Sequence, residues 1–184
     1  MNNMDNKICI ITGCNTGIGK ITAIELAKQG YEILMLVRDS QKSRNAFNEI
    51  KEAAKSDKIK LFYVDLASLK SIKEVTDEIK KNYSKIDVLI NNAGVFKRKY
   101  DKSIDGFEMT LAVNYFAPFM LTNQLLPLLK ESNQARIVNV SSELYKRGKV
   151  NIENNFSEKK FNGDKAYSNS KLLIIFFTRE LAKR

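Results

Sequence analysis

Short apolar runs alternate with longer amphipathic segments along most of this 184-residue chain. Each run is rich in Ile, Val and Leu, which is typical of a strand buried in a parallel sheet. We expect strands at residues 7–12, 32–37, 59–64, 86–90 and 136–140, and helices at residues 20–30, 41–55, 68–83, 106–130 and 165–184. This alternation predicts one α/β domain, residues 1–184, built on a doubly wound, Rossmann-type parallel sheet.

A glycine-rich turn follows the first predicted strand. Gly13 would permit the tight turn, Gly17 would let the backbone approach a diphosphate, and Gly19 would let the next helix pack closely on the strand. The N-terminus of that helix would then face the anion. A turn of this kind can also be a simple connection, but its place between a strand and a helix favours a dinucleotide-binding site.

Arg38 and Asp39 end the second predicted strand, where a dinucleotide-binding fold reads the adenosine ribose. An arginine pairs with the 2′-phosphate of NADP, whereas a carboxylate binds the free 2′-hydroxyl of NAD. Because Arg38 comes first, we favour NADP (NADPH) as the cofactor. Asp39 keeps NAD as the less favoured alternative, and an exposed charged loop is the third interpretation.

The composition argues against several other classes of function. The chain has no histidine and two cysteines, Cys9 and Cys14, so we expect thiols in a reducing compartment and no metal site. The net charge is +10, but the basic clusters at residues 97–99 and 146–149 lack the interleaved aromatics of a nucleic-acid surface. Residues 1–6 are polar, and the longest apolar run, residues 172–177, is too short to cross a bilayer. We therefore expect a cytoplasmic protein with no nucleic-acid partner and no transmembrane segment, and peripheral membrane association stays open.

Tyr167 and Lys171 lie four residues apart at the start of the last predicted helix, which places a phenol and an ammonium on one face. A neighbouring cation favours the phenolate and so suits proton transfer near neutral pH. Taken alone, the pair is more often a solvated helix face. Asn114 adds a polar amide within an apolar stretch, where it needs partners if buried. Pro118 should bend or interrupt that helix.

The last part of the chain contains three further features. Ser141 and Ser142 end the fifth predicted strand, and only one of them can face a given pocket. The connector at residues 143–163, with Asn151, Asn154, Asn155 and Asn162, is long enough to indicate a functional loop, and Asp164 is a plausible N-cap. Residues 172–177 are apolar around the whole helix, which predicts packing on the sheet on one side and a homodimer contact on the other.

These motifs, in this order on one chain, resemble the short-chain dehydrogenase/reductases. The resemblance rests on Thr12-Gly13-x3-Gly17-Ile18-Gly19, Asn91-Asn92-Ala93-Gly94, Asn114, Ser141-Ser142 and Tyr167-x3-Lys171. The segments around Asn114, at residues 136–142 and at residues 165–184 are similar to the retinol dehydrogenase and WW-domain oxidoreductase branch. The match extends over essentially the whole chain.

The resemblance implies an NADP-dependent oxidoreductase that interconverts an alcohol and a carbonyl on a small or lipophilic substrate. Tyr167 would be the proton donor, Lys171 would favour its phenolate and bind the nicotinamide ribose, Ser142 would orient the substrate oxygen, and Asn114 would hold a water in a proton relay. Asp65 would contact the adenine and Arg38 the 2′-phosphate. The implied cofactor-binding set is Gly13, Asn15, Thr16, Gly17, Ile18, Gly19, Arg38, Asp65, Leu66, Asn92, Ala93, Gly94, Tyr167 and Lys171.

The sequence departs from the family pattern after the last predicted helix. The family usually continues with two more strands, a loop that touches the nicotinamide and a segment that covers the substrate, and these would follow Arg184. We therefore expect a sheet that lacks the family's last strands. A non-catalytic nucleotide-binding or dimerisation module is the alternative function.

Overall fold

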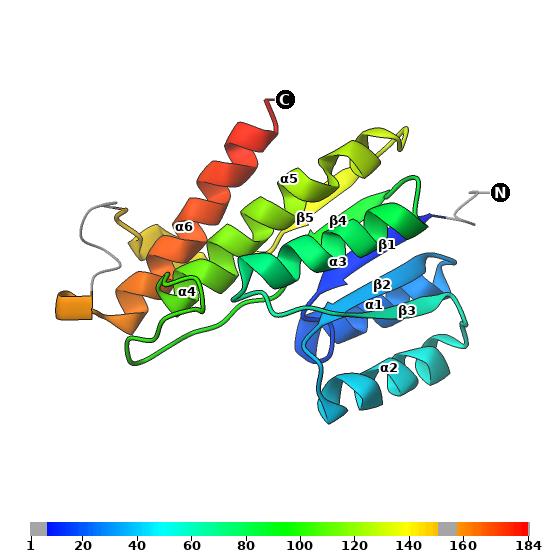
Figure 1. The fold of residues 1–184 in the computed structure, drawn as a ribbon, viewed down its shortest axis with the longest axis horizontal. Coiled ribbons are helices and arrows are strands. Elements are labelled where there is room, and N and C mark those ends of the chain that lie inside the picture. Colours follow the sequence, from blue (N-terminus) through cyan, green and yellow to red (C-terminus); the bar gives the residue numbers. More distant parts are fainter. Residues whose placement is uncertain (1–6, 151–157, 184) are drawn as a thin grey trace.

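A computed structural model describes residues 7–150 and 158–183, and it contains a five-stranded sheet in the order β3-β2-β1-β4-β5 (Figure 1). All neighbouring strands are parallel. Their bounds are close to the predicted ones: β1 (Ile8–Thr12), β2 (Glu32–Val37), β3 (Ile59–Tyr63), β4 (Val88–Asn91) and β5 (Arg136–Asn139). The strand order confirms the predicted doubly wound fold, in which the ligand crevice opens beyond the carboxyl ends of β1 and β4. The predictions for residues 1–6, for Asn151, Asn154 and Asn155 and for Arg184 lie outside the described residues.

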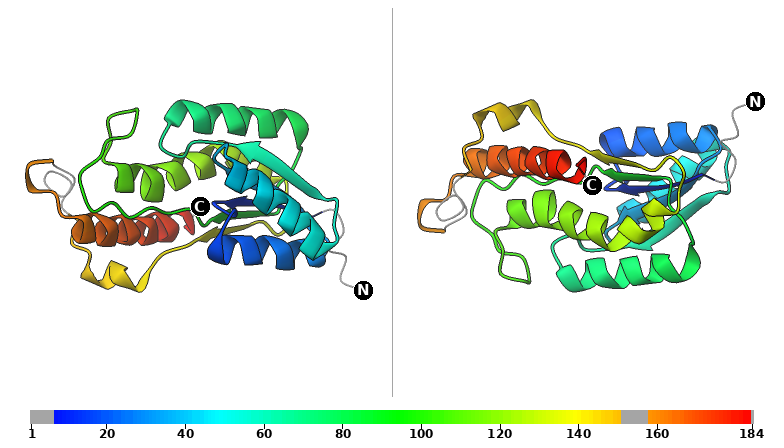
Figure 2. Two further views of the ribbon diagram at one scale, coloured as in Figure 1. Left: turned by 90° about the horizontal axis from the view of Figure 1, so that it is seen from below. Right: turned by 90° about the horizontal axis from the view of Figure 1, so that it is seen from above.

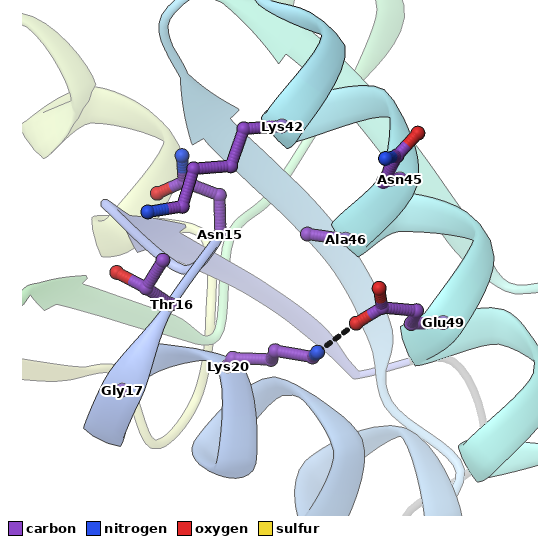
Figure 3. Close-up of a pocket in the computed structure, with 8 residues that line it drawn as sticks. All are labelled: Asn15, Thr16, Gly17, Lys20, Lys42, Asn45, Ala46 and Glu49. Carbon is purple, nitrogen blue, oxygen red and sulfur yellow. Dashed lines mark hydrogen bonds and ion pairs between the residues drawn. The ribbon is translucent and has the colours of Figure 1, made fainter.

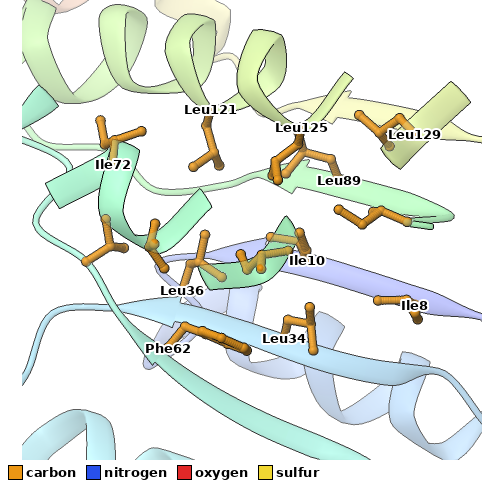
Figure 4. Packing of buried hydrophobic residues seen from close by; sticks show 14 of the residues in the cluster. Ile8, Ile10, Leu34, Leu36, Phe62, Ile72, Leu89, Leu121, Leu125 and Leu129 are labelled. Carbon is orange, nitrogen blue, oxygen red and sulfur yellow. The ribbon is translucent and has the colours of Figure 1, made fainter. Parts of the chain in front are cut away.

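Helices cover both faces of the sheet (Figure 2). Helices α1 (Gly17–Lys28) and α2 (Gln41–Ala54) pack on one face, and α3 (Leu69–Asn82) and α5 (Ala117–Lys130) pack on the other. Because side chains alternate along a strand, Ile10 and Leu34 point to the α3 and α5 side, where they meet Leu121 and Leu125 (Figure 4). No described helix has the length and hydropathy needed to span a bilayer.

Small residues form the buried face of α1. Gly19, Ala23 and Ala27 face the sheet, whereas Ile18 and Ile21 are 75% and 60% exposed. Small residues on the inner face let the helix approach β1 closely.

The predicted helix at residues 106–130 is divided near Pro118. A short helix α4 (Met109–Leu111) is followed by a π-helical turn η1 (Ala112–Phe116) and then by α5. Proline has no N–H, so Pro118 cannot donate to the carbonyl of Asn114, and the amide of Ala117 bonds instead to the carbonyl of Ala112, five residues back. The interruption expected at Pro118 is confirmed, while α5 continues through Pro127.

The last helix, α6 (Gly163–Leu181), begins earlier than predicted. Its N-cap is Asn162, whose side chain accepts the N–H of Lys165, so the assignment of Asp164 as the cap was wrong. The connector before it contains two 3₁₀ turns, η2 (Glu143–Arg147) and η3 (Glu158–Lys160). The polar first half of α6 is more buried than its apolar second half, where Phe176 is 48% exposed.

Candidate active site

The glycine loop after β1 is held against the end of β4. Gly13 has φ +65°, and a β-carbon there would lie 2.9 Å from the Cα of Ala93. The Thr12 hydroxyl oxygen accepts the N–H groups of Asn92 and Ala93, both at 3.0 Å. In return the Asn92 amide donates to the carbonyl of Thr12 at 2.9 Å. Thr12, which the sequence analysis quoted without a role, therefore fixes the distance between the two strand ends.

The N-terminus of α1 is open to an anion. Thr16, the residue before the helix, makes no side-chain capping bond, and the first turn carries no acidic residue. The serine or asparagine before α2, α3 and α6 does cap its helix. The first N–H groups of α1 thus keep the partial positive charge that suits a diphosphate. A β-carbon on Gly17 would meet nothing within 4 Å, so the backbone is accessible at this point.

A pocket of about 510 Å³ lies beside this loop, between α1 and α2 (Figure 3). Lys20 forms an ion pair with Glu49 across it, and the Lys42 side chain extends toward Asn15. The Asn15 amide donates to the Ser43 hydroxyl at 3.3 Å, which joins the loop to the start of α2. The full lining is Asn15, Thr16, Gly17, Lys20, Lys42, Asn45, Ala46 and Glu49.

The ends of β2 and β3 complete the same side of the crevice. Arg38 follows β2 and is exposed, and its carbonyl accepts the Ser43 hydroxyl at 2.7 Å. Asp65 follows β3 and is exposed, with one carboxylate oxygen accepting the N–H of Ala67 at 2.9 Å. Leu66 beside it is half-buried. These residues lie where the sequence placed the adenosine end of a cofactor.

Two of the residues predicted to be catalytic, Asn114 and Lys171, are buried and come from η1 and α6. Asn114 of η1 is 2% exposed, and its oxygen accepts the N–H of Val95 at 2.8 Å. Its amide donates to the Val95 carbonyl and to the Ser170 hydroxyl, both at 3.0 Å. Lys171 of α6 is 4% exposed, and its ammonium donates to the Val140 carbonyl at 2.9 Å.

Gly94 brings the two groups together. A β-carbon on this residue would lie 3.5 Å from the Asn114 oxygen and 3.5 Å from the Lys171 nitrogen. That distance is ordinary van der Waals contact, so the end of β4 lies directly beside both groups.

Lys171 and Tyr167 form the pair expected from their spacing. The ammonium nitrogen lies 5.7 Å from the centre of the Tyr167 ring. Burial lowers the pKa of Lys171, because the surroundings disfavour the charged form. The Tyr167 ring makes an edge contact with Phe96, with centroids 5.7 Å apart. Phe96 and Ser170 are contacts that the sequence pattern did not single out.

The two serines after β5 have different partners. The Ser141 hydroxyl donates to the carbonyl of Lys171 at 3.0 Å, whereas the Ser142 oxygen accepts the N–H of Leu144 at 3.3 Å. The proton of Ser141 is therefore engaged on α6, and the bond recorded for Ser142 uses its oxygen and not its proton. The choice of Ser142 over Ser141 as the donor to a substrate oxygen stays a prediction.

Sequence comparison identifies the family. The model of the short chain dehydrogenase family matches residues 7–184. The chain belongs to this family. Retinol dehydrogenase 14 of Mus musculus is 42% identical over 191 residues, with 98% of this chain and 57% of the relative covered. Retinol dehydrogenase 13 of Homo sapiens is 42% identical over 179 residues, with 97% and 54% covered. These relatives confirm the resemblance to the retinol dehydrogenase branch, and the chain spans little more than half of their length.

Solved structures of the family have the same fold. A crystal structure of an uncharacterised protein from Mycobacterium paratuberculosis is 37% identical, with a TM-score of 0.84 over 97% of this chain and 62% of that one. A short-chain dehydrogenase from Shigella flexneri, solved in complex with NADP, is 25% identical, with a TM-score of 0.79 over 100% of this chain and 74% of that one.

Proposed function

We propose that this chain is an NADP-dependent oxidoreductase that interconverts an alcohol and a carbonyl. The observation that carries the proposal is the position of Asn114 and Lys171 beside Gly94, just after β4, with the Tyr167 ring next to the Lys171 ammonium. The retinol dehydrogenase relatives point to a lipophilic substrate. Because the chain covers only part of those relatives, their activity is carried over here as part of the proposal.

The residues of the crevice fit a dinucleotide. The uncapped N-terminus of α1 would bind the diphosphate. Arg38 and Lys42 would face the 2′-phosphate, Asp65 the adenine, and Ala93 and Gly94 the nicotinamide ribose. An NADP-bound structural relative supports this choice. The cofactor, when bound, supplies or accepts the hydride at its nicotinamide ring.

The side chains of the chain itself handle the proton. In the reducing direction Tyr167 gives its phenolic proton to the carbonyl oxygen as the carbon gains a hydride, and in the oxidising direction the phenolate takes that proton back. The Lys171 ammonium lies 5.7 Å from the centre of the ring and so places a positive charge beside the phenol. Ser142 donates to the substrate oxygen and orients it. Asn114, whose carbonyl has no α-helical partner because residue 118 is proline, would hold the water that returns a proton toward Lys171.

The test is Tyr167→Phe. Turnover of a panel of carbonyl substrates with NADPH should fall by about 10²–10⁴-fold, the usual contribution of a positioned proton donor. Binding of NADPH, measured by calorimetry, should change little, because the ring and its contact with Phe96 remain. Tyr83→Phe is the matched control, since it removes a hydroxyl bonded to Glu32, away from the crevice. Retained turnover in Tyr167→Phe would contradict the proposed mechanism.

A non-catalytic nucleotide-binding and dimerisation module is the second candidate. It is favoured by the exposure of Phe176 on α6. We further propose a homodimer through α6, and a cytoplasmic location in which the buried thiols Cys9 and Cys14 stay reduced. Bound NADPH and dimers without turnover would favour the module, whereas turnover by this 184-residue chain would exclude it.

A further inference from the structure

Two side chains of opposite charge, Arg38 and Asp39, follow strand β2, where a dinucleotide-binding fold contacts the adenosine ribose. Arg38 favours a 2′-phosphate, whereas the carboxylate of Asp39 repels one and suits the free 2′-hydroxyl of NAD. With both side chains equally available, this strand end would not discriminate strongly between the two cofactors. The contacts of Asp39 therefore decide how strongly the site prefers NADP over NAD.

Asp39 is paired with Arg44 of α2. One guanidinium nitrogen of Arg44 donates to the Asp39 carboxylate and also to the Tyr63 hydroxyl, the latter at 3.2 Å. The guanidinium carbon lies 5.9 Å from the centre of the Tyr63 ring. Tyr63 is the last residue of β3, so Arg44 is held between the ends of two neighbouring strands.

The helix start explains this geometry. Ser40 is the N-cap of α2 and accepts the N–H of Ser43. Asp39 is then the residue before the cap and Arg44 the fourth residue of the helix, and these two positions lie side by side at a helix N-terminus. The Asp39 and Arg44 side chains are 61% and 47% exposed, and an ion pair of this exposure contributes little to folding. Its place at the rim of the crevice gives it a more direct effect on the cofactor.

We propose that Arg44 sets the cofactor preference by neutralising Asp39, so that the end of β2 accepts a 2′-phosphate. With Arg44 present, the three charged groups Arg38, Asp39 and Arg44 sum to +1. Without it, Arg38 and Asp39 sum to zero, and the carboxylate is released to face the ribose. Arg44 is thus a positioning residue: it acts on the cofactor through Asp39. The inference rests on the proposed function and adds how its cofactor is chosen.

The test measures cofactor binding and does not depend on turnover. Dissociation constants of NADPH and NADH are measured by calorimetry at low salt, where charge effects are least screened. Arg44→Gln should weaken NADPH binding about tenfold, which is ~1.4 kcal/mol, while NADH binding stays equal or becomes tighter. The double variant Arg44→Gln with Asp39→Asn should recover most of the NADPH affinity, because the carboxylate that Arg44 neutralises is gone. Raising the salt concentration should reduce the effect of Arg44→Gln.

A matched control is available on the same helix. Lys51 forms an exposed ion pair with Asp57 at the far end of α2, so Lys51→Gln removes one positive charge without touching the strand ends. It should leave the ratio of the two dissociation constants unchanged. Thermal unfolding of each variant confirms that the fold is retained.

Two results would overturn the inference alone. An unchanged NADPH-to-NADH ratio in Arg44→Gln would show that the ion pair does not act on the cofactor. A double variant that binds NADPH as weakly as Arg44→Gln would show that Arg44 contacts the phosphate directly and not through Asp39. A wild-type chain that binds neither cofactor would contradict the proposed function as well.

Discussion

At the scale of single residues, Lys171 shows how a site residue costs stability. Its ammonium is buried, and burial lowers its pKa below the usual value of ~10.4. Between the lowered pKa and that value the unfolded chain binds more protons than the folded chain, so the stability of the wild type rises with pH in this interval. Below the lowered pKa the ammonium is charged in both states, and the full free-energy cost of burying that charge remains.

Lys171→Met removes this titration. We expect the free energy of unfolding of the wild type, relative to the variant, to increase as the pH rises toward ~10.4. Urea denaturation at several pH values measures it. Lys70→Met, at a side chain that is 85% exposed, should follow the wild-type pH curve closely. Parallel curves for the wild type and Lys171→Met would contradict the burial effect. Turnover by Lys171→Met should also be lost, since the phenol loses its neighbouring cation.

At the scale of elements, Asp87 joins three segments at the amino-terminal edge of the sheet. It is 6% exposed, and its carboxylate accepts the N–H of Ile8 at 2.8 Å and the hydroxyl of Ser132 at 2.6 Å. Burial alone would raise the pKa of Asp87, but these two donors and the Lys85 ammonium hold it below its usual range. The stabilisation is therefore complete above the usual carboxyl pKa and is lost as the pH falls through the lowered value.

Asp87→Asn should destabilise the fold by about 1–3 kcal/mol at pH 7, because one oxygen is replaced by an amide that cannot accept, and a buried donor loses its partner. The acid-dependent part of the stability should shrink in the same variant. Denaturant titrations at pH 7 and below pH ~4 test both effects. Asp77→Asn is the control, since Asp77 pairs with Lys73 on the surface of α3 and its loss should matter little. Equal stability of Asp87→Asn and the wild type would refute the joining role.

The elements also show how far the sequence could predict the molecule. The strands, the parallel doubly wound sheet and the break near Pro118 depend on local patterns and were predictable. The inner face of α1 was not, because Gly19 and Ala23 allow a close approach that apolar spacing cannot express. For the site, the spacing of Tyr167 and Lys171 predicted that the two side chains are neighbours, whereas their catalytic role rests on the family resemblance and stays a prediction. The contacts of Asn114 with Val95 and Ser170 join segments far apart in the sequence, so a local sequence pattern could not predict them.

At the scale of the whole molecule, the described chain leaves apolar side chains exposed beside α6. Phe119 of α5, Val138 of the edge strand β5 and Phe176 of α6 are 45%, 44% and 48% exposed. Phe177 packs against Phe119, with ring centroids 5.3 Å apart, so aromatic rings of α5 and α6 are in contact beneath these exposed side chains. Contiguous exposed apolar surface is typical of an interaction site, and a helix surface that matches itself suits a two-fold dimer.

Phe176→Asp tests that dimer. The wild type should associate as its concentration rises in sedimentation experiments, because two copies of the surface bury each other's aromatic rings. The variant should stay monomeric, since a carboxylate buried there would be unpaired. Its NADPH affinity should be retained, because Phe176 lies on α6 beyond Tyr167 and Lys171. Ile104→Asp is the control: this residue is 85% exposed, and its neighbour Asp105 accepts the N–H of Leu69 at the start of α3, so a charge there should leave association unchanged. A wild type that remains monomeric at every concentration would show that this surface is not an interface between copies of this chain.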